Sequence, residues 1–131
     1  MTVLPDTSIW VDYLRAGVDG PAAGLDRLLA EESVAICGPV LAELVAGTAA
    51  EDRDELWHAL ATLPWAELDH EAWRRVGELA FTLRQAGLSL PLTDVEIAVA
   101  CTSSGAVLWT RDDDFHRLRS HLPSLQLYDA A

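Results

Sequence analysis

Residues 3–10 of the chain are Val-Leu-Pro-Asp-Thr-Ser-Ile-Trp. A short apolar run ends in the carboxylate of Asp6, and two hydroxyl residues precede an amphipathic segment. This order predicts a buried strand that delivers Asp6 to its carboxyl end, with Thr7 or Ser8 as the N-cap of the next helix. Ligands of open α/β sheets bind outside the carboxyl ends of the strands. Asp6 is therefore either a simple loop or capping acid or the first member of a site.

The composition is that of an ordinary globular protein. The 131 residues, half of them hydrophobic and 23% charged, predict a single domain spanning 1–131 with one core. Neither a bilayer-spanning run nor a signal peptide is recognisable, so we expect a cytoplasmic protein without membrane contact. The net charge of −12 argues against generic attraction to nucleic acid. All nine basic residues are arginine, which excludes mechanisms that need a catalytic lysine.

Several reactive or bulky residues are assigned to the core. Cys37 and Cys101 have apolar neighbours and no ligand spacing, so we expect two reduced core thiols. We assign Trp57, Trp65 and Trp73 to the core as well, with a partner interface as the alternative.

Short apolar runs alternate with helical patterns along the chain. Strands are predicted at 3–5, 34–37 and 106–109, with shorter ones at 65–68 and 125–128. Helices are predicted at 9–15, 21–32, 39–46, 52–63 and 70–85, then up to Gly105, and finally through Leu118. This alternation predicts an α/β protein with a parallel, doubly wound sheet.

Five acids occupy positions that a solvated helix face does not explain. They lie at a strand end, at a helix start or inside an apolar helix: Asp6, Glu43, Asp94, Asp112 and Asp114. Strand ends on one edge of a parallel sheet converge, so these acids can share one pocket. Converging carboxylates must take up protons or bind a hard divalent cation, and oxygen ligands suit Mg²⁺ or Mn²⁺.

Each acid also has a structural explanation. Asp6 could cap a helix, Asp94 could complement a helix dipole, Glu43 could pair with an arginine, and Asp112 with Asp114 could form a solvated turn. The coincidence of all of them favours a site.

The segment before the second cysteine carries a further acid. Thr93 and Glu96 have the spacing of a capping box, which predicts Asp94 at the first helical position. The capping box explains Glu96, so we place Glu96 outside the site.

Four segments together resemble PIN-domain ribonucleases of the VapC toxin type. They are Leu-Pro-Asp-Thr-Ser-Ile-Trp, Leu-Ala-Glu-Leu, Leu-Thr-Asp-Val-Glu-Ile-Ala-Val-Ala and Thr-Arg-Asp-Asp-Asp-Phe, in family order across nearly the whole chain. The resemblance implies a three-layer α/β/α fold, with about five strands in a short parallel sheet and an acidic pocket at their carboxyl ends. It also implies an Mg²⁺- or Mn²⁺-dependent endoribonuclease that leaves a 5′-phosphate and a 3′-hydroxyl and inhibits translation and growth.

The same resemblance implies partners: a VapB-type antitoxin, a second copy of the chain in a homodimer, and DNA only through the antitoxin. The chain would be the toxin of a type II toxin–antitoxin pair.

The resemblance maps the family's acids onto this sequence in order. The first is Asp6, the second Glu43, the third Asp94 and the fourth Asp112, with Asp114 as an additional acid. Asp6, Asp94, Asp112 and Asp114 are the expected metal ligands. Glu43 is expected to ligate, to orient the attacking water or to act as a base.

Polar residues beside the acids are expected to contact the substrate. Thr7, Ser8 and Thr110 match the family's hydroxyl positions, and Arg111 either reaches a phosphate or is solvated. Pro5 stands where an aliphatic residue is usual, which predicts a short first strand.

Two other acid-based enzyme classes are excluded, and one non-enzymatic reading stays open. Receiver domains and haloacid-dehalogenase-type phosphatases both need a lysine, which this chain lacks. A catalytically silent PIN-like module that only binds a partner protein is the remaining alternative.

Overall fold

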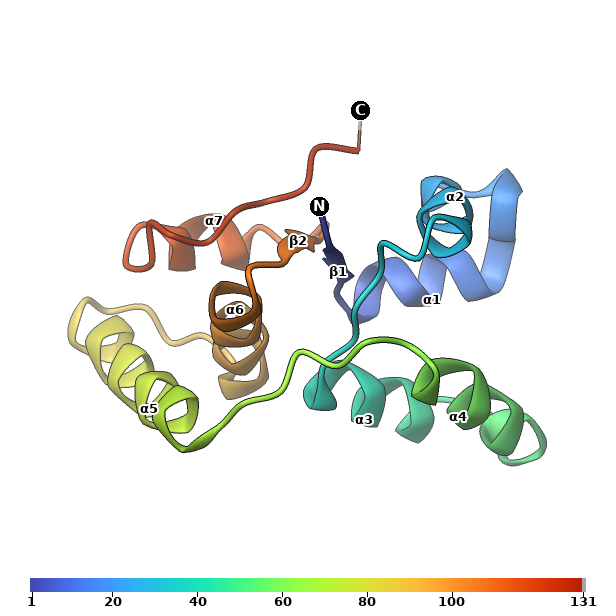
Figure 1. The fold of residues 1–131 in the computed structure, drawn as a ribbon. Helices are drawn as coiled ribbons and strands as arrows, with labels where there is room; N and C mark the ends of the chain where they lie inside the picture. Colours follow the sequence, from blue (N-terminus) through green and yellow to red (C-terminus); the bar gives the residue numbers. More distant parts are fainter. Residues whose placement is uncertain (131) are drawn as a thin grey trace.

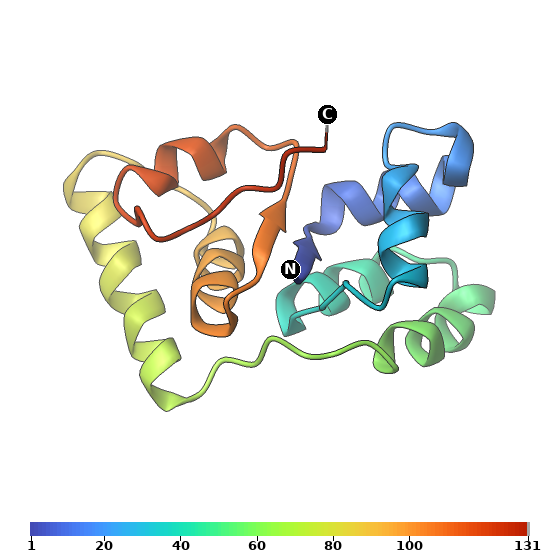
Figure 2. The same cartoon turned by 45° about the horizontal axis from the view of Figure 1, so that its top comes forward.

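A computed structural model describes residues 1–130. In chain order its elements are β1 (Val3–Pro5), α1 (Thr7–Ala16), η1 (Gly17–Asp19), α2 (Gly24–Ala30), α3 (Gly38–Ala46), η2 (Ala50–Asp52), α4 (Arg53–Ala61), α5 (His70–Gln85), α6 (Leu92–Ser104), β2 (Val107–Trp109) and α7 (Asp114–Arg119). The two strands lie at the centre of the molecule (Figure 1). Helices α1 to α4 lie to one side of them and α5 to α7 to the other, in both Figure 1 and Figure 2.

Strands β1 and β2 pair in parallel, although they stand at opposite ends of the sequence. Leu4 faces Leu108 in the register, and Pro5 faces Trp109. The backbone N–H of Asp6 donates to the carbonyl of Trp109 at 2.9 Å, which extends the pairing to the first site acid. The expected short first strand is confirmed, because β1 has three residues and ends at Pro5.

Three further segments join this pair through isolated parallel bridges. The bridged pairs are Val3 with Val34, Ile36 with Trp65, and Leu108 with Leu127. Each bridge consists of two backbone hydrogen bonds around one residue, which is too short a ladder to make a strand. The parallel α/β fold is thus confirmed, whereas the expected five-strand count is not: the described residues contain two strands and these bridges.

The core lies between the strands and the helices. Its largest fully buried side chains include Leu4, Ile9 and Phe115, from β1, α1 and α7. Cys37 and Cys101 are buried free thiols, as predicted. Burial raises the pKa of Cys37 to about 11 and raises the pKa of Cys101 as well. These thiols are therefore packing residues and not nucleophiles.

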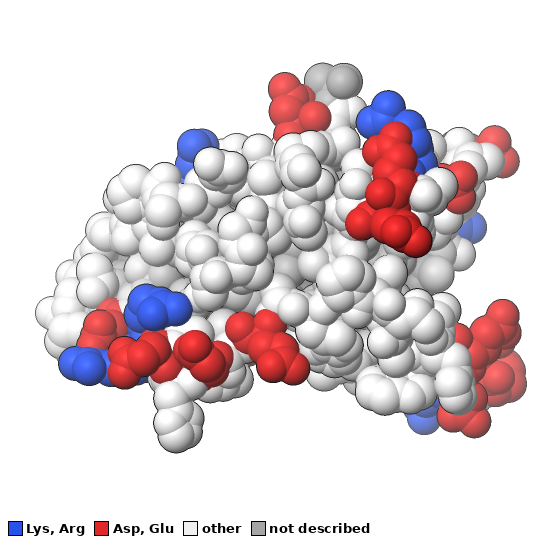
Figure 3. All heavy atoms as spheres, in the orientation of Figure 1, with Lys and Arg blue, Asp and Glu red and all other residues white. Residues whose placement is uncertain are grey.

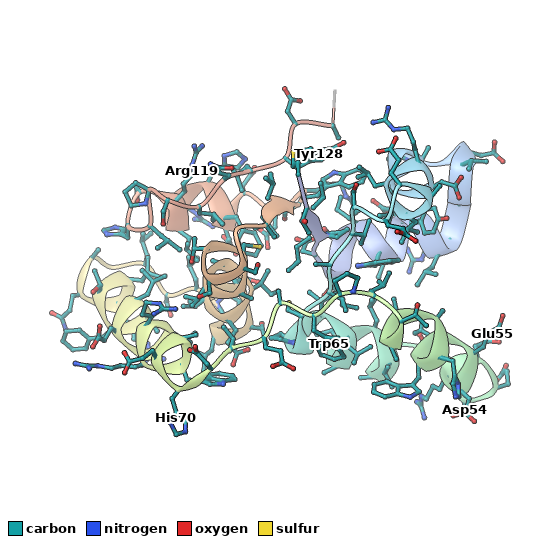
Figure 4. All side chains as sticks on the ribbon, viewed as in Figure 1. Asp54, Glu55, Trp65, His70, Arg119 and Tyr128 are labelled. Atoms are coloured by element: carbon teal, nitrogen blue, oxygen red, sulfur yellow. The ribbon has the colours of Figure 1, made fainter. Side chains whose placement is uncertain are left out.

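The assignment of three tryptophans to the core is wrong. Trp57, Trp65 and Trp73 are 45%, 41% and 49% exposed. Trp65 lies on the connection between α4 and α5 (Figure 4). Amphipathic spacing places a tryptophan on a face, but it does not reveal whether another element covers that face.

Acidic side chains are spread over the surface. Figure 3 shows them in several groups, one of which lies at the end of the molecule that carries α4, where Glu51, Asp52, Asp54 and Glu55 are exposed. Asp54 and Glu55 lie at the outer edge of this end (Figure 4). Among residues 1–130, no helix has the length and apolarity to cross a membrane.

Helix α6 begins earlier than the sequence predicts. Pro91 is its N-cap residue, no side chain caps it, and Leu92 is the first helical residue. Asp94 donates its backbone N–H to the Pro91 carbonyl at 3.0 Å, so this acid stands in the third position and not the first. The predicted capping box of Thr93 is therefore wrong, because the N-cap is Pro91, two residues upstream, where the proline ring fixes the backbone φ angle.

Candidate metal centre

Asp6 is both a helix cap and a buried site acid. It is 5% exposed and is the buried polar residue of the described core. Its Oδ1 accepts from the backbone N–H of Ile9 at 3.2 Å and from the hydroxyl of Ser8 at 2.5 Å. Its Oδ2 accepts from the hydroxyl of Thr110. Asp6, and not Thr7 or Ser8, therefore caps α1, and its carboxylate is held by three donors.

Asp94 has the opposite environment, because its carboxylate lacks a donor. It lies in the first turn of α6, and its Oδ2 is buried without a hydrogen-bond partner among the described residues. Burial, followed by the charges of Asp112, Asp6 and Glu43 in that order, raises the pKa of Asp94 to about 6. Asp6 precedes α1, Glu43 lies on α3 and Asp112 follows β2, so acids from separate segments contribute to the raised pKa of Asp94.

The loop after β2 and the first residue of α7 bring two more carboxylates to Asp94. Oxygen atoms of Asp94, Asp112 and Asp114 all lie within 4.8 Å of one another. The backbone N–H of Asp114 donates to Asp112 Oδ1 at 2.9 Å, and Arg117 contacts Asp114 Oδ1. Asp6 does not belong to this group, because its oxygens are directed to Ser8 and Thr110.

Glu43 lies at the edge of the acidic cluster. It projects from α3, is exposed, and accepts a hydrogen bond at Oε1 from the hydroxyl of Thr7 at 2.7 Å. Its charge contributes to the raised pKa of Asp94. The arginine partner that the structural explanation of Glu43 required is not among the described ion pairs.

Glu96 is a neighbouring acid that the sequence analysis excluded. Burial, followed by the charge of Glu43, raises its pKa. Glu96 therefore lies within the electrostatic influence of Glu43, and it does not cap α6 as the Thr93 spacing suggested. The sequence does contain a signal for Glu96, because this acid interrupts an apolar helical run in the same way as Glu43.

The three predicted hydroxyl residues each bond to a candidate site acid, whereas Arg111 pairs with an acid outside the candidate site. Thr7 bonds to Glu43, and Ser8 and Thr110 bond to Asp6. Arg111 instead places its Nε 2.8 Å from Asp12 Oδ2 on α1. These hydroxyls fix the acids, whereas the guanidinium fixes the loop to α1.

The donor set fits a hard divalent cation. The three grouped carboxylates offer oxygen ligands only, and the buried Asp94 Oδ2 has no other partner among the described residues. Mg²⁺ and Mn²⁺ prefer such ligands, and a cation would neutralise the repulsion that raises the pKa of Asp94. These carboxylates lie beyond the carboxyl end of β2, at the edge of the sheet where ligands of open α/β sheets bind.

The chain belongs to the PIN domain family, whose model matches residues 3–120. A VapC ribonuclease of Mycobacterium bovis is 31% identical over 118 residues, which cover 86% of this chain and 88% of that protein. Ribonuclease VapC11 of Mycobacterium tuberculosis matches equally well.

Solved structures show the same fold. The crystal structure of VapBC2 from Rickettsia felis, bound to a DNA fragment from their promoter, matches with a TM-score of 0.75 and 25% identity over 98% of both chains. The DNA-bound VapBC from Salmonella typhimurium has a TM-score of 0.76 at 20% identity, again over 98% of both chains.

Proposed function

We propose that this chain is an Mg²⁺- or Mn²⁺-dependent endoribonuclease and the toxin of a type II toxin–antitoxin pair. The observation that carries the proposal is the convergence of Asp94, Asp112 and Asp114 around a buried oxygen without a donor. Family membership and the VapC relatives supply the reaction class. Net charge alone would repel RNA, so substrate binding depends on the neutralised pocket.

Each site residue receives a separate role in this proposal. Asp94, Asp112 and Asp114 hold the metal, and Asp6 stands beside them as a fixed negative charge that orders Ser8 and Thr110. A bound Mg²⁺ or Mn²⁺ supplies Lewis acidity that stabilises the charge of the reacting phosphodiester.

Glu43 is the candidate proton acceptor. It is exposed, and Thr7 binds one of its oxygens and fixes its direction, which leaves the other free to face a water. Thr7, Ser8 and Thr110 form the polar lining of the substrate path. Cleavage would leave a 5′-phosphate and a 3′-hydroxyl.

The proposal includes partners and location. The related VapBC structures support a VapB-type antitoxin, through which the complex would reach DNA. The exposed Trp57, Trp65 and Trp73 favour a protein interface, and we propose a homodimer in the cytoplasm. Inhibition of translation and growth would follow from cleavage of cellular RNA.

The test compares antitoxin-free wild type with Asp94→Asn and with Glu67→Gln. Both variants lose one negative charge, but Glu67 is exposed on the α4–α5 connection and does not belong to the grouped acids. Wild type and Glu67→Gln should cut end-labelled RNA with Mg²⁺ or Mn²⁺ and stop in EDTA, whereas Asp94→Asn should be inactive. Absence of cleavage by wild type with either ion, together with normal growth on induction, would favour the silent binding module.

A further inference from the structure

The proposed chemistry gives no role to Arg111, whose side chain pairs with Asp12. Of the four ion pairs in the described part of the chain, three join residues three or four positions apart in sequence. Only the pair of Arg111 with Asp12 joins remote segments, with Nε and Oδ2 2.8 Å apart. It ties the middle of α1 to the loop that carries Asp112 and Asp114.

Asp12 is the buried partner of this pair. Its side chain is 15% exposed, against 55% for Arg111, and its Oδ2 is shielded from solvent without a hydrogen bond. A shielded carboxylate loses much of its hydration, and a cation at contact distance compensates for that loss. The carboxylate of Asp12 therefore depends on the guanidinium of Arg111 for compensation, and this pairing holds the guanidinium at α1.

A second connection fixes the same loop to the start of α1. Thr110 donates to Asp6, the N-cap residue of α1, and accepts from the backbone N–H of Asp112 at 2.9 Å. Asp112 in turn accepts from the backbone N–H of Asp114 at 2.9 Å. The loop is thus attached to α1 at two points, through Thr110 and through Arg111.

We propose that Asp12 and Arg111 are positioning residues that hold residues 110–114 where Asp112 and Asp114 can share a metal with Asp94. The inference rests on the proposed function for the metal, and it replaces the phosphate contact expected for Arg111. Neither residue touches the reacting atoms. Their effect passes through the backbone of the loop, as partners of metal ligands commonly act.

The first test measures loop order in metal-free protein. Asp12→Asn, Arg111→Gln and the double variant are compared with Arg74→Gln, which breaks the exposed 2.9 Å pair with Glu78 on α5. Nitrogen-15 relaxation should show the loop amides of 112 and 114 rigid in wild type and Arg74→Gln, with order parameters of about 0.85. Both single variants should lower them to about 0.6. Unchanged loop order parameters in Arg111→Gln overturn the proposal. The Arg111 side chain is exposed, so this variant should fold.

The second test measures Mn²⁺ affinity from the free-ion EPR signal, without RNA. Each single variant should bind Mn²⁺ about tenfold more weakly, and the double variant no more weakly than either. If Arg111→Gln binds Mn²⁺ like wild type and only raises KM for RNA, Arg111 contacts phosphate and the inference is wrong. If wild type itself binds no Mn²⁺, the proposed function fails, and so does the metal part of this inference. Normal binding by wild type with unaffected variants overturns the inference alone.

Discussion

Replacing Asp94 with asparagine should stabilise the metal-free protein while destroying its site. In the folded chain the pKa of Asp94 is raised from 3.8 to about 6, first by burial and then by the neighbouring acids. Between those values the folded state keeps a proton that the unfolded state releases, so stability falls as pH rises through this window. Above about pH 7 the Asp94 carboxyl is ionised in both states, and the folded state is destabilised by the full amount.

The size of the effect follows from that pKa difference. About two pKa units correspond to about 3 kcal/mol. Asp94 is only partly buried, so solvent screening reduces the cost to about 1–2 kcal/mol. An asparagine side chain keeps the shape of the aspartate without its charge, and Asp94→Asn should therefore gain this amount in urea unfolding at about pH 7.5 with EDTA.

Three comparisons test the electrostatic origin of this gain. Glu67→Gln removes the same charge from an exposed position, so its free energy of unfolding should rise little. The advantage of Asp94→Asn should vanish towards about pH 4, where wild type is protonated in the fold. Saturating Mn²⁺ should stabilise wild type, by about 2.7 kcal/mol at one hundred times Kd, and leave the variant unchanged. An equal or lower stability of Asp94→Asn in the alkaline measurement would refute this account of the site.

Three further substitutions test the local structure, each by urea unfolding in EDTA. Thr110→Val removes the hydroxyl donor to buried Asp6 and should lower the free energy of unfolding by about 1–3 kcal/mol. A loss below about 0.5 kcal/mol, the size of a surface substitution, would show that this hydrogen bond is dispensable. Asp69→Ala removes the side chain that caps α5 and should cost about 1 kcal/mol, whereas Asp69→Ser should retain most of the stability. Gly105→Ala should cost about 1 kcal/mol, because Gly105 has φ +76° with open space around it, so the backbone alone resists a side chain. Gly77→Ala, in helix α5 with equally open surroundings, should instead stabilise, and a similar sign for both glycine variants would contradict the conformational explanation.

The sequence predicted those parts of the fold that depend on local patterns. Apolar runs located β1 and β2, and Gly105 marked the end of α6. The rule that the carboxyl ends of parallel strands share an edge predicted that the acids would meet, and the structure groups three of them, Asp94, Asp112 and Asp114. The exact membership of the metal group did not follow, since side-chain directions decide it.

The failures share one cause, which is that tertiary contacts override local signals. Thr93 has the spacing of a capping residue, but Pro91 begins α6 first. The direction of Arg111 depends on Asp12, which lies in the first helix, far away in sequence, and was assigned no role. The exposure of Trp57 depends on which elements cover α4, and a helical pattern does not contain that information.

The different environments of Asp6 and Asp94 explain why the unfavourable electrostatic energy of the site is concentrated on Asp94. Asp6 is more deeply buried, yet three donors satisfy its carboxylate, including the hydroxyls of Ser8 and Thr110. Asp94 has a buried oxygen with no donor among the described residues and three acidic neighbours. A metal ligand needs an uncommitted oxygen, and an uncommitted buried carboxylate costs stability until a cation arrives. Asp6 is thus held in place by its donors, whereas a metal bound as proposed would relieve the unfavourable burial of Asp94 and so link metal binding to folding stability at that residue.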